Sequence, residues 1–207
     1  MIDILKLFAA LAVGYLLGSL NTAVIVGKIC GKDIRCHGSK SAGLTNTLRV
    51  LGKSAAVFVL VGDILKGMIA CYIGLLLGVY FYSGGAVDSV SLLVAGAGAV
   101  IGHNWPVYFR FKGGKGALTA VAVLFMIDWV IALLCLGFFV IIVALTRYVS
   151  LGTICATMLI VAISFIPVFG HTLYFNIFAC LMALMVLFRH MENIQRLLLG
   201  TENKITF

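Results

Sequence analysis

The sequence predicts an all-α integral membrane protein with about seven transmembrane helices, its N-terminus outside the cell and its C-terminus in the cytoplasm. Of the 207 residues, 63% are hydrophobic and only 11% are charged, and the mean hydropathy is +1.18. A soluble domain of this size cannot bury so much apolar surface. The apolar residues form continuous runs, whereas a transmembrane β-barrel alternates apolar and polar residues, so the spans are predicted to be helices.

Polar stretches and turns separate the seven predicted spans. The spans cover residues 4–29, 55–81, 90–101, 117–127, 129–146, 150–166 and 173–188. The apolar residues 117–146 are interpreted as two spans, because Asp128 divides them and one span needs only about 20 residues. Between spans lie the polar stretches 31–54 and 102–116 and a short loop around Gly84 and Gly85. A polar tail, residues 189–207, follows the last span. The whole chain, residues 1–207, is expected to form one polytopic membrane domain.

Positive charge is distributed unequally between the two sides of this topology. Of the 15 Lys and Arg residues, only Lys6 falls on the outer side. The other 14 fall on one side: Lys28, Lys32, Arg35, Lys40, Arg49, Lys53, Lys66, Arg110, Lys112, Lys115, Arg147, Arg189, Arg196 and Lys204. The positive-inside rule makes this side cytoplasmic. The net charge of +8 is therefore attributed to topology, and no nucleic-acid partner is expected.

Cysteine and glycine residues inside the spans are interpreted as structural. The six cysteines show no metal-ligand spacing, so no metal site and no cofactor are expected. Small residues let membrane helices approach closely. Helix contacts are therefore predicted at the glycines within spans, which include Gly14, Gly18, Gly74, Gly78, Gly96 and Gly98.

The segment FKGGKGALT, residues 111–119, has the composition of an anion site. Its glycines leave backbone N–H groups accessible, Lys112 and Lys115 add charge, and a helix starting near Ala117 would direct its positive end at the same place. A phosphate is the natural ligand. The segment lacks the G-x-x-x-x-G-K-[ST] pattern, so a nucleoside triphosphate is not indicated.

Two ionisable residues lie deep in the second span. Asp63 and Lys66 share one side of a helix at i, i+3 spacing, about 15 Å from its start. Such groups usually face a wet cavity, although a structural ion pair is also compatible with the spacing. His37, His103 and His190 are likewise either site residues or packing residues at the membrane interface.

Longer motifs resemble a known family over nearly the whole chain. They are GSLN at Gly18, DIRCHGSKSAGLTN at residues 33–46, GHNWPVYFRFKGGKGALT at 102–119, TRYVSL at 146–151 and RHMENIQRLLLGTENK at 189–204. In this order they resemble the bacterial acyl-phosphate:glycerol-3-phosphate acyltransferases, the PlsY family. The resemblance implies a seven-span enzyme of the bacterial inner (plasma) membrane whose active site faces the cytoplasm. It also implies transfer of a fatty acyl group from acyl phosphate to the sn-1 hydroxyl of glycerol 3-phosphate, the first step of phospholipid synthesis.

The resemblance also assigns roles to residues. Ser39 and Arg35 match the catalytic residues of the first motif, and His190 and Asn193 match those of the third motif. The phosphate loop corresponds to Lys112, Gly113, Gly114, Lys115 and Gly116. Glu202 matches a residue thought structural. Further substrate-binding candidates are Lys66 in the second span, and His103, Asn46 and Arg196 in the polar stretches and the tail. This chain departs from the family pattern at Ser41, where Asn is usual, at Leu44, where Ala is usual, and in having GSLN where GSIP is common.

The residue types fit acyl transfer from an activated donor. An acyl phosphate already carries a good leaving group, so clustered cations and N–H groups that hold two anions together suffice, and direct transfer without an acyl-enzyme is expected. The proton acceptor is either a substrate phosphate or His190. The alternative is a membrane transporter of an organic phosphate or other anion, which the nearly uncharged outer loops disfavour. Acyl phosphate, glycerol 3-phosphate and the lipid bilayer are the expected partners; the oligomeric state is left open, a monomer being one option.

The charge distribution leads to a topology prediction. A cysteine placed at Gly85 should react with a membrane-impermeant reagent added outside the cell, whereas one at Lys40 or Thr201 should react only after the membrane is opened. Reaction of position 40 with the external reagent would overturn the predicted orientation.

Overall fold

The computed structural model describes residues 2–83 and 86–205, so the predicted loop residues Gly84 and Gly85 lie outside the described residues. It divides into two compact units. The first comprises Met1–Phe81 and Ser89–Ile127, and the second Tyr82–Asp88 and Asp128–Phe207.

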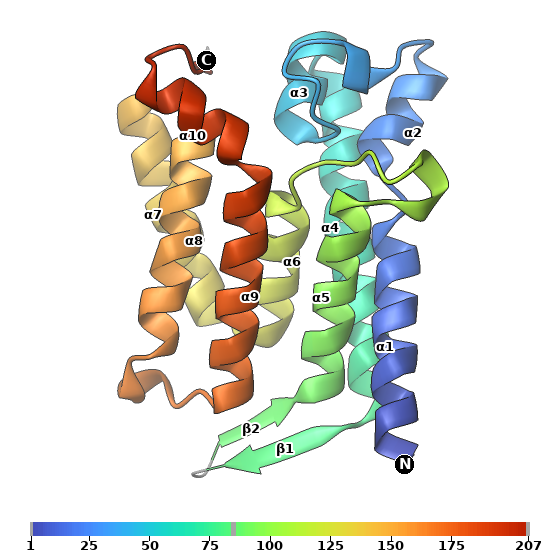
Figure 1. The fold of residues 1–207 in the computed structure, drawn as a ribbon, viewed down its shortest axis with the longest axis vertical. Helices are drawn as coiled ribbons and strands as arrows, with labels where there is room; N and C mark the ends of the chain where they lie inside the picture. The colour runs from blue at the N-terminus through green and yellow to red at the C-terminus, as the bar shows by residue number, and fades with distance from the viewer. Residues whose placement is uncertain (1, 84–85, 206–207) are drawn as a thin grey trace. The chain divides into compact units, whose positions relative to one another are not determined.

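The first unit contains six α-helices and both polar stretches. The helices are α1 (Ile2–Gly18), α2 (Thr22–Ile29), α3 (Leu44–Leu51), α4 (Lys53–Leu77), α5 (Val90–Asn104) and α6 (Ala117–Ile127), with short 3-10 turns at Ile34–Cys36 and Val107–Phe109. Helices α1, α4 and α5 pack on one another, and α6 packs on α4 and α5. Within this unit α2, α3 and the loop before α6 lie toward the end opposite the N-terminus (Figure 1).

The second unit contains the remaining helices. They are α7 (Trp129–Thr146), α8 (Val149–Ser164), α9 (Leu173–Arg189) and α10 (Met191–Leu198), with a 3-10 turn at Pro167–Phe169. Helix α8 contacts both α7 and α9, and α10 is bent by 60° from α9. Two short strands, β1 (Tyr80–Ser83) and β2 (Ala86–Ser89), pair in a two-stranded sheet. The sequence predicts the end of the second span at residues 80 and 81 and a short loop after it, so neither strand was expected.

Each of the seven predicted spans is largely helical, which confirms the all-helical membrane class. The second ends earlier than predicted, because α4 stops at Leu77 and residues 80 and 81 lie in β1. Within the described ranges, four helical stretches are long and apolar enough to cross a membrane: Asp3–Ile29, Lys53–Leu77, Val90–Phe109 and Trp129–Thr146. A fifth is added if the bent pair α9 and α10 counts as one span, while α6 and α8 are shorter apolar helices. The count of seven spans and the orientation of the termini stay predictions.

The first predicted span is interrupted where α1 ends and α2 begins. Ser19 and Asn21 lie in the break and are fully buried. The side-chain oxygen of Asn21 accepts a hydrogen bond from the N–H of Val24 (3.1 Å) and so caps α2. Hydropathy alone does not reveal this break, because the residues around it are apolar.

Glycines bring α1 and α5 into backbone contact, as predicted. A Cβ atom added at Gly14 or Gly18 would collide with the backbone of Ala95 or Ala99, and one at Gly102 would collide with the backbone of α1. Gly74 and Gly96 are equally tight against neighbouring helices. Gly78 is the exception. It ends α4 in the left-handed conformation (φ +67°) and has no close helix contact.

Glu202 fastens the polar tail to the helices of the second unit. Its carboxylate accepts hydrogen bonds from Asn193 Nδ2 (2.6 Å), Arg196 Nε (2.7 Å) and Ser150 Oγ (2.9 Å). The side chain is 7% exposed. Burial acts to raise the pKa of Glu202, but the hydrogen bonds from Arg196, Asn193 and Ser150 outweigh it, so its pKa is lowered. This geometry fits the structural role that the resemblance implies for Glu202.

Glu202→Gln should destabilise the protein by about 1.5–3 kcal/mol at pH 7, because it removes charge-assisted hydrogen bonds from a largely buried site. The folded-state pKa is lowered, so the stabilisation is present above the unfolded pKa of about 4.3 and is lost as the pH falls through the folded value. Thermal unfolding in detergent at pH 7 and below pH 4 measures both effects.

The matched control is Glu192→Gln on α10, the helix that carries Arg196. Glu192 also faces Arg196, at 3.7 Å, but is 86% exposed, so little change is expected. Equal effects of the two substitutions would contradict the assigned role of Glu202.

Candidate active site

Asn46 organises the first motif, residues 33–46, from within. Its side chain is almost fully buried. Its Oδ1 accepts from the backbone N–H of Ser39 (2.8 Å), and its Nδ2 donates to the carbonyl oxygens of Ile34 (3.1 Å), His37 (3.0 Å) and Ser41 (3.0 Å). The amide is thus engaged within the loop. Ser39 is half-buried, and among the described residues its hydroxyl has no hydrogen-bond partner, so Asn46 positions a hydroxyl that remains able to contact a ligand.

Arg35 connects the first motif to the glycine–lysine loop, residues 112–116. Its Nε and Nη2 donate to the two carboxylate oxygens of Asp33 (2.9 and 2.8 Å), and its Nη1 donates to the carbonyl oxygens of Phe109 (3.1 Å) and Lys112 (3.4 Å). The hydrogen bonds from Arg35 lower the pKa of Asp33 to about 2, and those to Asp33 raise the pKa of Arg35. A guanidinium has five N–H groups, so these contacts engage most of them.

Asn21 joins the first motif to the end of α5. Its Nδ2 lies 3.3 Å from the carbonyl oxygen of His103 and 3.5 Å from that of Ala42, and donates to both. Asn21 is the last residue of the GSLN motif, and no role is predicted for it from the sequence. An amide inside an apolar run is costly without partners, and that is the signal that could have identified it.

Gly114 lies where the first motif and the glycine–lysine loop meet. Its backbone N–H donates to the carbonyl oxygen of His103 (3.1 Å). A Cβ at this position would collide with Nε2 of His103 and with the carbonyl oxygen of Ala42. The expectation of an accessible N–H is therefore wrong for Gly114, since that group holds the loop on α5. Its lack of a side chain is what allows the segments to converge.

The loop ends directly at the start of α6. Gly116 has φ +74°, a conformation that favours glycine, and the first N–H groups of the helix have no partner inside it. Asn104 lies beside Gly116 and is fully buried. In the part of the chain that the structure describes, neither polar atom of its side chain has a hydrogen-bond partner. A buried amide without a partner is costly, which favours a ligand or water at this point.

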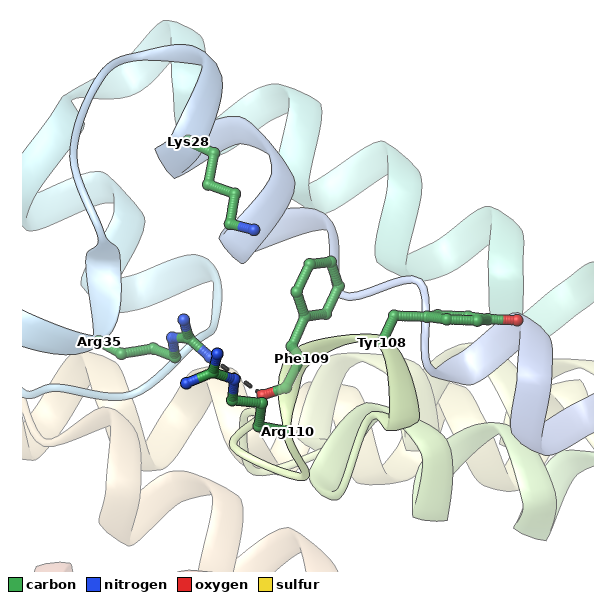
Figure 2. Close-up of a pocket in the computed structure, with 5 residues that line it drawn as sticks. All are labelled: Lys28, Arg35, Tyr108, Phe109 and Arg110. Carbon is green, nitrogen blue, oxygen red and sulfur yellow. Dashed lines mark hydrogen bonds between the residues drawn. The ribbon is translucent and has the colours of Figure 1, made fainter.

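A basic pocket of about 220 Å³ lies next to Arg35 and is lined by Lys28, Arg35, Tyr108, Phe109 and Arg110 (Figure 2). The Lys28 ammonium lies 5.2 Å from the centre of the Phe109 ring, a cation–π contact. Arg35 and Arg110 approach the Phe109 carbonyl side of the pocket, while Lys28 lies across from them (Figure 2). The lining residues include three cations and no acid, which suits an anionic group. From the sequence, Lys28 and Arg110 are predicted only to contribute to the membrane topology.

Asp63, Lys66 and His103 form a buried cluster between α4 and α5. Lys66 Nζ lies 2.8 Å from Asp63 Oδ1, 2.9 Å from His103 Nδ1 and 3.3 Å from the carbonyl oxygen of Leu20. The side chains of Lys66, Asp63 and His103 are 5%, 1% and 4% exposed. Asp63 contributes through its charge, since neither oxygen accepts a well-directed hydrogen bond within the described chain. The ion pair between Asp63 and Lys66, one of the two interpretations that the sequence allowed, is therefore present.

The third-motif candidates lie in the second unit, at the bend between α9 and α10. His190 is buried, and its Nδ1 lies 2.8 Å from the carbonyl oxygen of Val186. A carbonyl only accepts, so Nδ1 carries a hydrogen. Asn193 and Arg196 both donate to Glu202. The candidate residues thus form two groups: one in the first unit around Gly114, and one in the second unit around Glu202.

Comparison with known proteins agrees with the motif order. A family model described as glycerol-3-phosphate acyltransferase matches residues 8–200. A glycerol-3-phosphate acyltransferase from Thermoanaerobacter pseudethanolicus is 41% identical, over 93% of this chain and 92% of its own length.

Two solved structures also resemble the chain, each at 36% sequence identity. Both are crystal structures of PlsY (YgiH), an integral membrane glycerol 3-phosphate acyltransferase. The glycerol 3-phosphate form has a TM-score of 0.87 and covers 97% of this chain and 96% of that one. The lysophosphatidic acid form has a TM-score of 0.84 and covers 97% and 95%. The motifs, the fold and these relatives together show that the chain is an integral membrane acyltransferase and belongs to the glycerol-3-phosphate acyltransferase family.

Proposed function

We propose that the protein transfers a fatty acyl group from acyl phosphate to the sn-1 hydroxyl of glycerol 3-phosphate, producing lysophosphatidic acid and inorganic phosphate. The observation that carries the proposal is the convergence at Gly114 of the first motif, the end of α5 and the glycine–lysine loop. This convergence places a serine hydroxyl and several cations within one unit. The related crystal structures with glycerol 3-phosphate and lysophosphatidic acid support the acceptor and the product.

The glycine–lysine loop is proposed to bind the phosphate of glycerol 3-phosphate. Lys112 is exposed and Lys115 is half-buried, and the start of α6 follows the loop directly. Two cations and the positive end of a helix together favour a dianionic group. Gly113 and Gly116 keep the backbone close to Asn104, whose unpartnered amide would complete the phosphate contacts. Arg35 and Asn46 act by holding this loop and Ser39 in position.

The acyl phosphate is proposed to react directly with the acceptor. The sn-1 oxygen attacks the acyl carbon, the bond from that carbon to the phosphate oxygen breaks, and inorganic phosphate leaves with the electron pair. Ser39 orients or polarises the donor, and the nearby cations stabilise the departing phosphate. The proton goes to a substrate phosphate or to His190. The Nδ1–H of His190 bonds to Val186, so the neutral ring presents Nε2 as an acceptor.

The proposal also covers the candidate residues of the second unit and the side of the membrane that the active site faces. His190 and Asn193 contribute to catalysis and Arg196 to substrate binding, with Glu202 holding the last two in place. The active site faces the cytoplasm of the bacterial inner membrane, which the charge distribution supports. A transporter of an organic phosphate is the weaker candidate, since family membership and the product-bound relative favour an enzyme.

Substitutions in the glycine–lysine loop should weaken the use of glycerol 3-phosphate. Gly114→Ala adds a Cβ that displaces His103 or Ala42, and mainly the KM for glycerol 3-phosphate is expected to rise. Lys115→Ala removes one charge-assisted contact and should cost about 1.5–3 kcal/mol in kcat/KM. Steady-state kinetics of the purified protein with acyl phosphate measure both.

The matched control for the glycine substitution is Gly137→Ala in α7. A Cβ there meets no atom within 4 Å, so kinetics close to wild type are expected. If kcat/KM stayed unchanged in both loop variants, the loop would have to be removed from the substrate site.

The donor and the direct route are tested together. Pure reconstituted protein should form lysophosphatidic acid from acyl phosphate and glycerol 3-phosphate, and Ser39→Ala should lower turnover strongly while thermal stability stays near wild type. Stability should be kept because the Ser39 hydroxyl has no hydrogen-bond partner among the described residues, so its removal breaks no bond within them. Ser54→Ala, at an exposed position of α4, is the control.

Incubation with acyl phosphate alone should leave the protein mass unchanged. A gain of one acyl chain that vanishes in Ser39→Ala would make Ser39 a nucleophile and exclude direct transfer. Absence of product from the wild-type protein with both substrates would contradict the proposed function itself.

A further inference from the structure

Three groups of the protein contact the Lys66 ammonium. They are Asp63 Oδ1 at 2.8 Å, His103 Nδ1 at 2.9 Å and the Leu20 carbonyl oxygen at 3.3 Å. An ammonium has three N–H groups and no acceptor, and this one is 95% buried, since 5% of the side chain is exposed. Lys66 is therefore engaged by the protein itself. This differs from the substrate-binding role that its sequence position suggested.

The contact with Lys66 determines which nitrogen of His103 carries hydrogen. Because the ammonium can only donate, Nδ1 must accept, and the ring hydrogen of the neutral imidazole lies on Nε2. Thr119 Oγ1 lies 3.4 Å from the same Nδ1 and can also donate to it. Asp63 Oδ1, at 3.7 Å from Nδ1, is beyond hydrogen-bond distance.

The charges of the cluster favour the same state. Asp63 and Lys66 form a neutral pair that is almost fully buried. A protonated His103 would place a second cation 2.9 Å from the ammonium, with one carboxylate to offset both. Like charges interact strongly at that distance in a medium of low dielectric constant.

We propose that Lys66 and Asp63 are positioning residues that hold His103 as a neutral ring with its N–H at Nε2, directed at Gly114. A Cβ added at Gly114 would meet both Nε2 of His103 and the carbonyl oxygen of Ala42. These two atoms therefore lie on the same side of Gly114, where the two loops meet. The inference rests on the proposed function for its catalytic meaning. The ring edge facing this junction is a hydrogen-bond donor suited to an anionic oxygen of a phosphate or acyl group, and it is not the base that removes the hydroxyl proton.

The protonation state can be measured without substrate. Protein labelled with ¹⁵N-histidine in lipid nanodiscs should show His103 at pH 7 as a neutral ring protonated at Nε2, with His103→Asn identifying its signals. Lys66→Met removes the donor to Nδ1, so a population protonated at Nδ1 should appear. Lys53→Met, an exposed lysine on the same helix, should leave the spectrum unchanged.

Two results would overturn the inference: a wild-type His103 that is doubly protonated or protonated at Nδ1, or a ring state unaffected by Lys66→Met. If Lys66→Met does not fold, the wild-type spectrum alone still decides. Because these spectra need no substrate, they are independent of whether the proposed reaction is correct.

Kinetics then separate positioning from substrate binding. Lys66→Met should lower kcat/KM roughly 10- to 100-fold, by analogy with the loss of a partner that orients a metal-ligating histidine. A positioning role predicts this loss together with the altered ring state. A raised KM for glycerol 3-phosphate with an unchanged ring state would instead make Lys66 a substrate ligand and contradict the inference.

Discussion

The backbone contact between α1 and α5 is the constraint on which the rest of the first unit depends. Gly14, Gly18 and Gly102 leave no room for a side chain between the two helices. In a bilayer, lipid tails are as apolar as the helices, so close packing and hydrogen bonds hold helices together. At the end of this contact Tyr15 Oη donates to the Trp105 carbonyl oxygen (2.9 Å), and Asn21 donates to that of His103. The loops of the site are thus attached to a helix pair whose spacing the glycines determine.

Burial separates the cations of the first unit into two kinds. Lys66 is almost fully buried, and its position requires a carboxylate and two neutral acceptors to offset the loss of water. Lys28, Arg110 and Lys112 are exposed and keep their hydration until a ligand arrives. Arg35 lies between these extremes, since its bonds to Asp33 and to the loop carbonyls hold it in place. A buried cation therefore shapes the site, whereas an exposed one can bind an anion.

The sequence predicts those features that depend on neighbours along the chain. The helices over 117–127 and 129–146 agree with the structure residue for residue, because Asp128 caps α7 locally by accepting from Val130 and Ile131. The glycine contacts follow from composition within a span. By contrast, the Arg35 guanidinium donates to carbonyl oxygens that lie 74 and 77 residues away in the sequence. Lys66 contacts His103, which lies 37 residues away. Spacing identifies such residues as unusual but does not say which neighbour they meet.

The two histidines next to the motifs are held in opposite hydrogen-bonding states by the protein. His103 accepts at Nδ1 from an ammonium, whereas His190 donates from Nδ1 to the carbonyl oxygen of Val186. When both rings are neutral, the remaining nitrogen is a donor in His103 and an acceptor in His190. Acyl transfer from a mixed anhydride needs a donor for the oxygen that gains charge and an acceptor for the hydroxyl proton. An imidazole cannot serve as both in one tautomer. In the proposed reaction, donation therefore falls to His103, and acceptance falls to His190 or to a substrate phosphate.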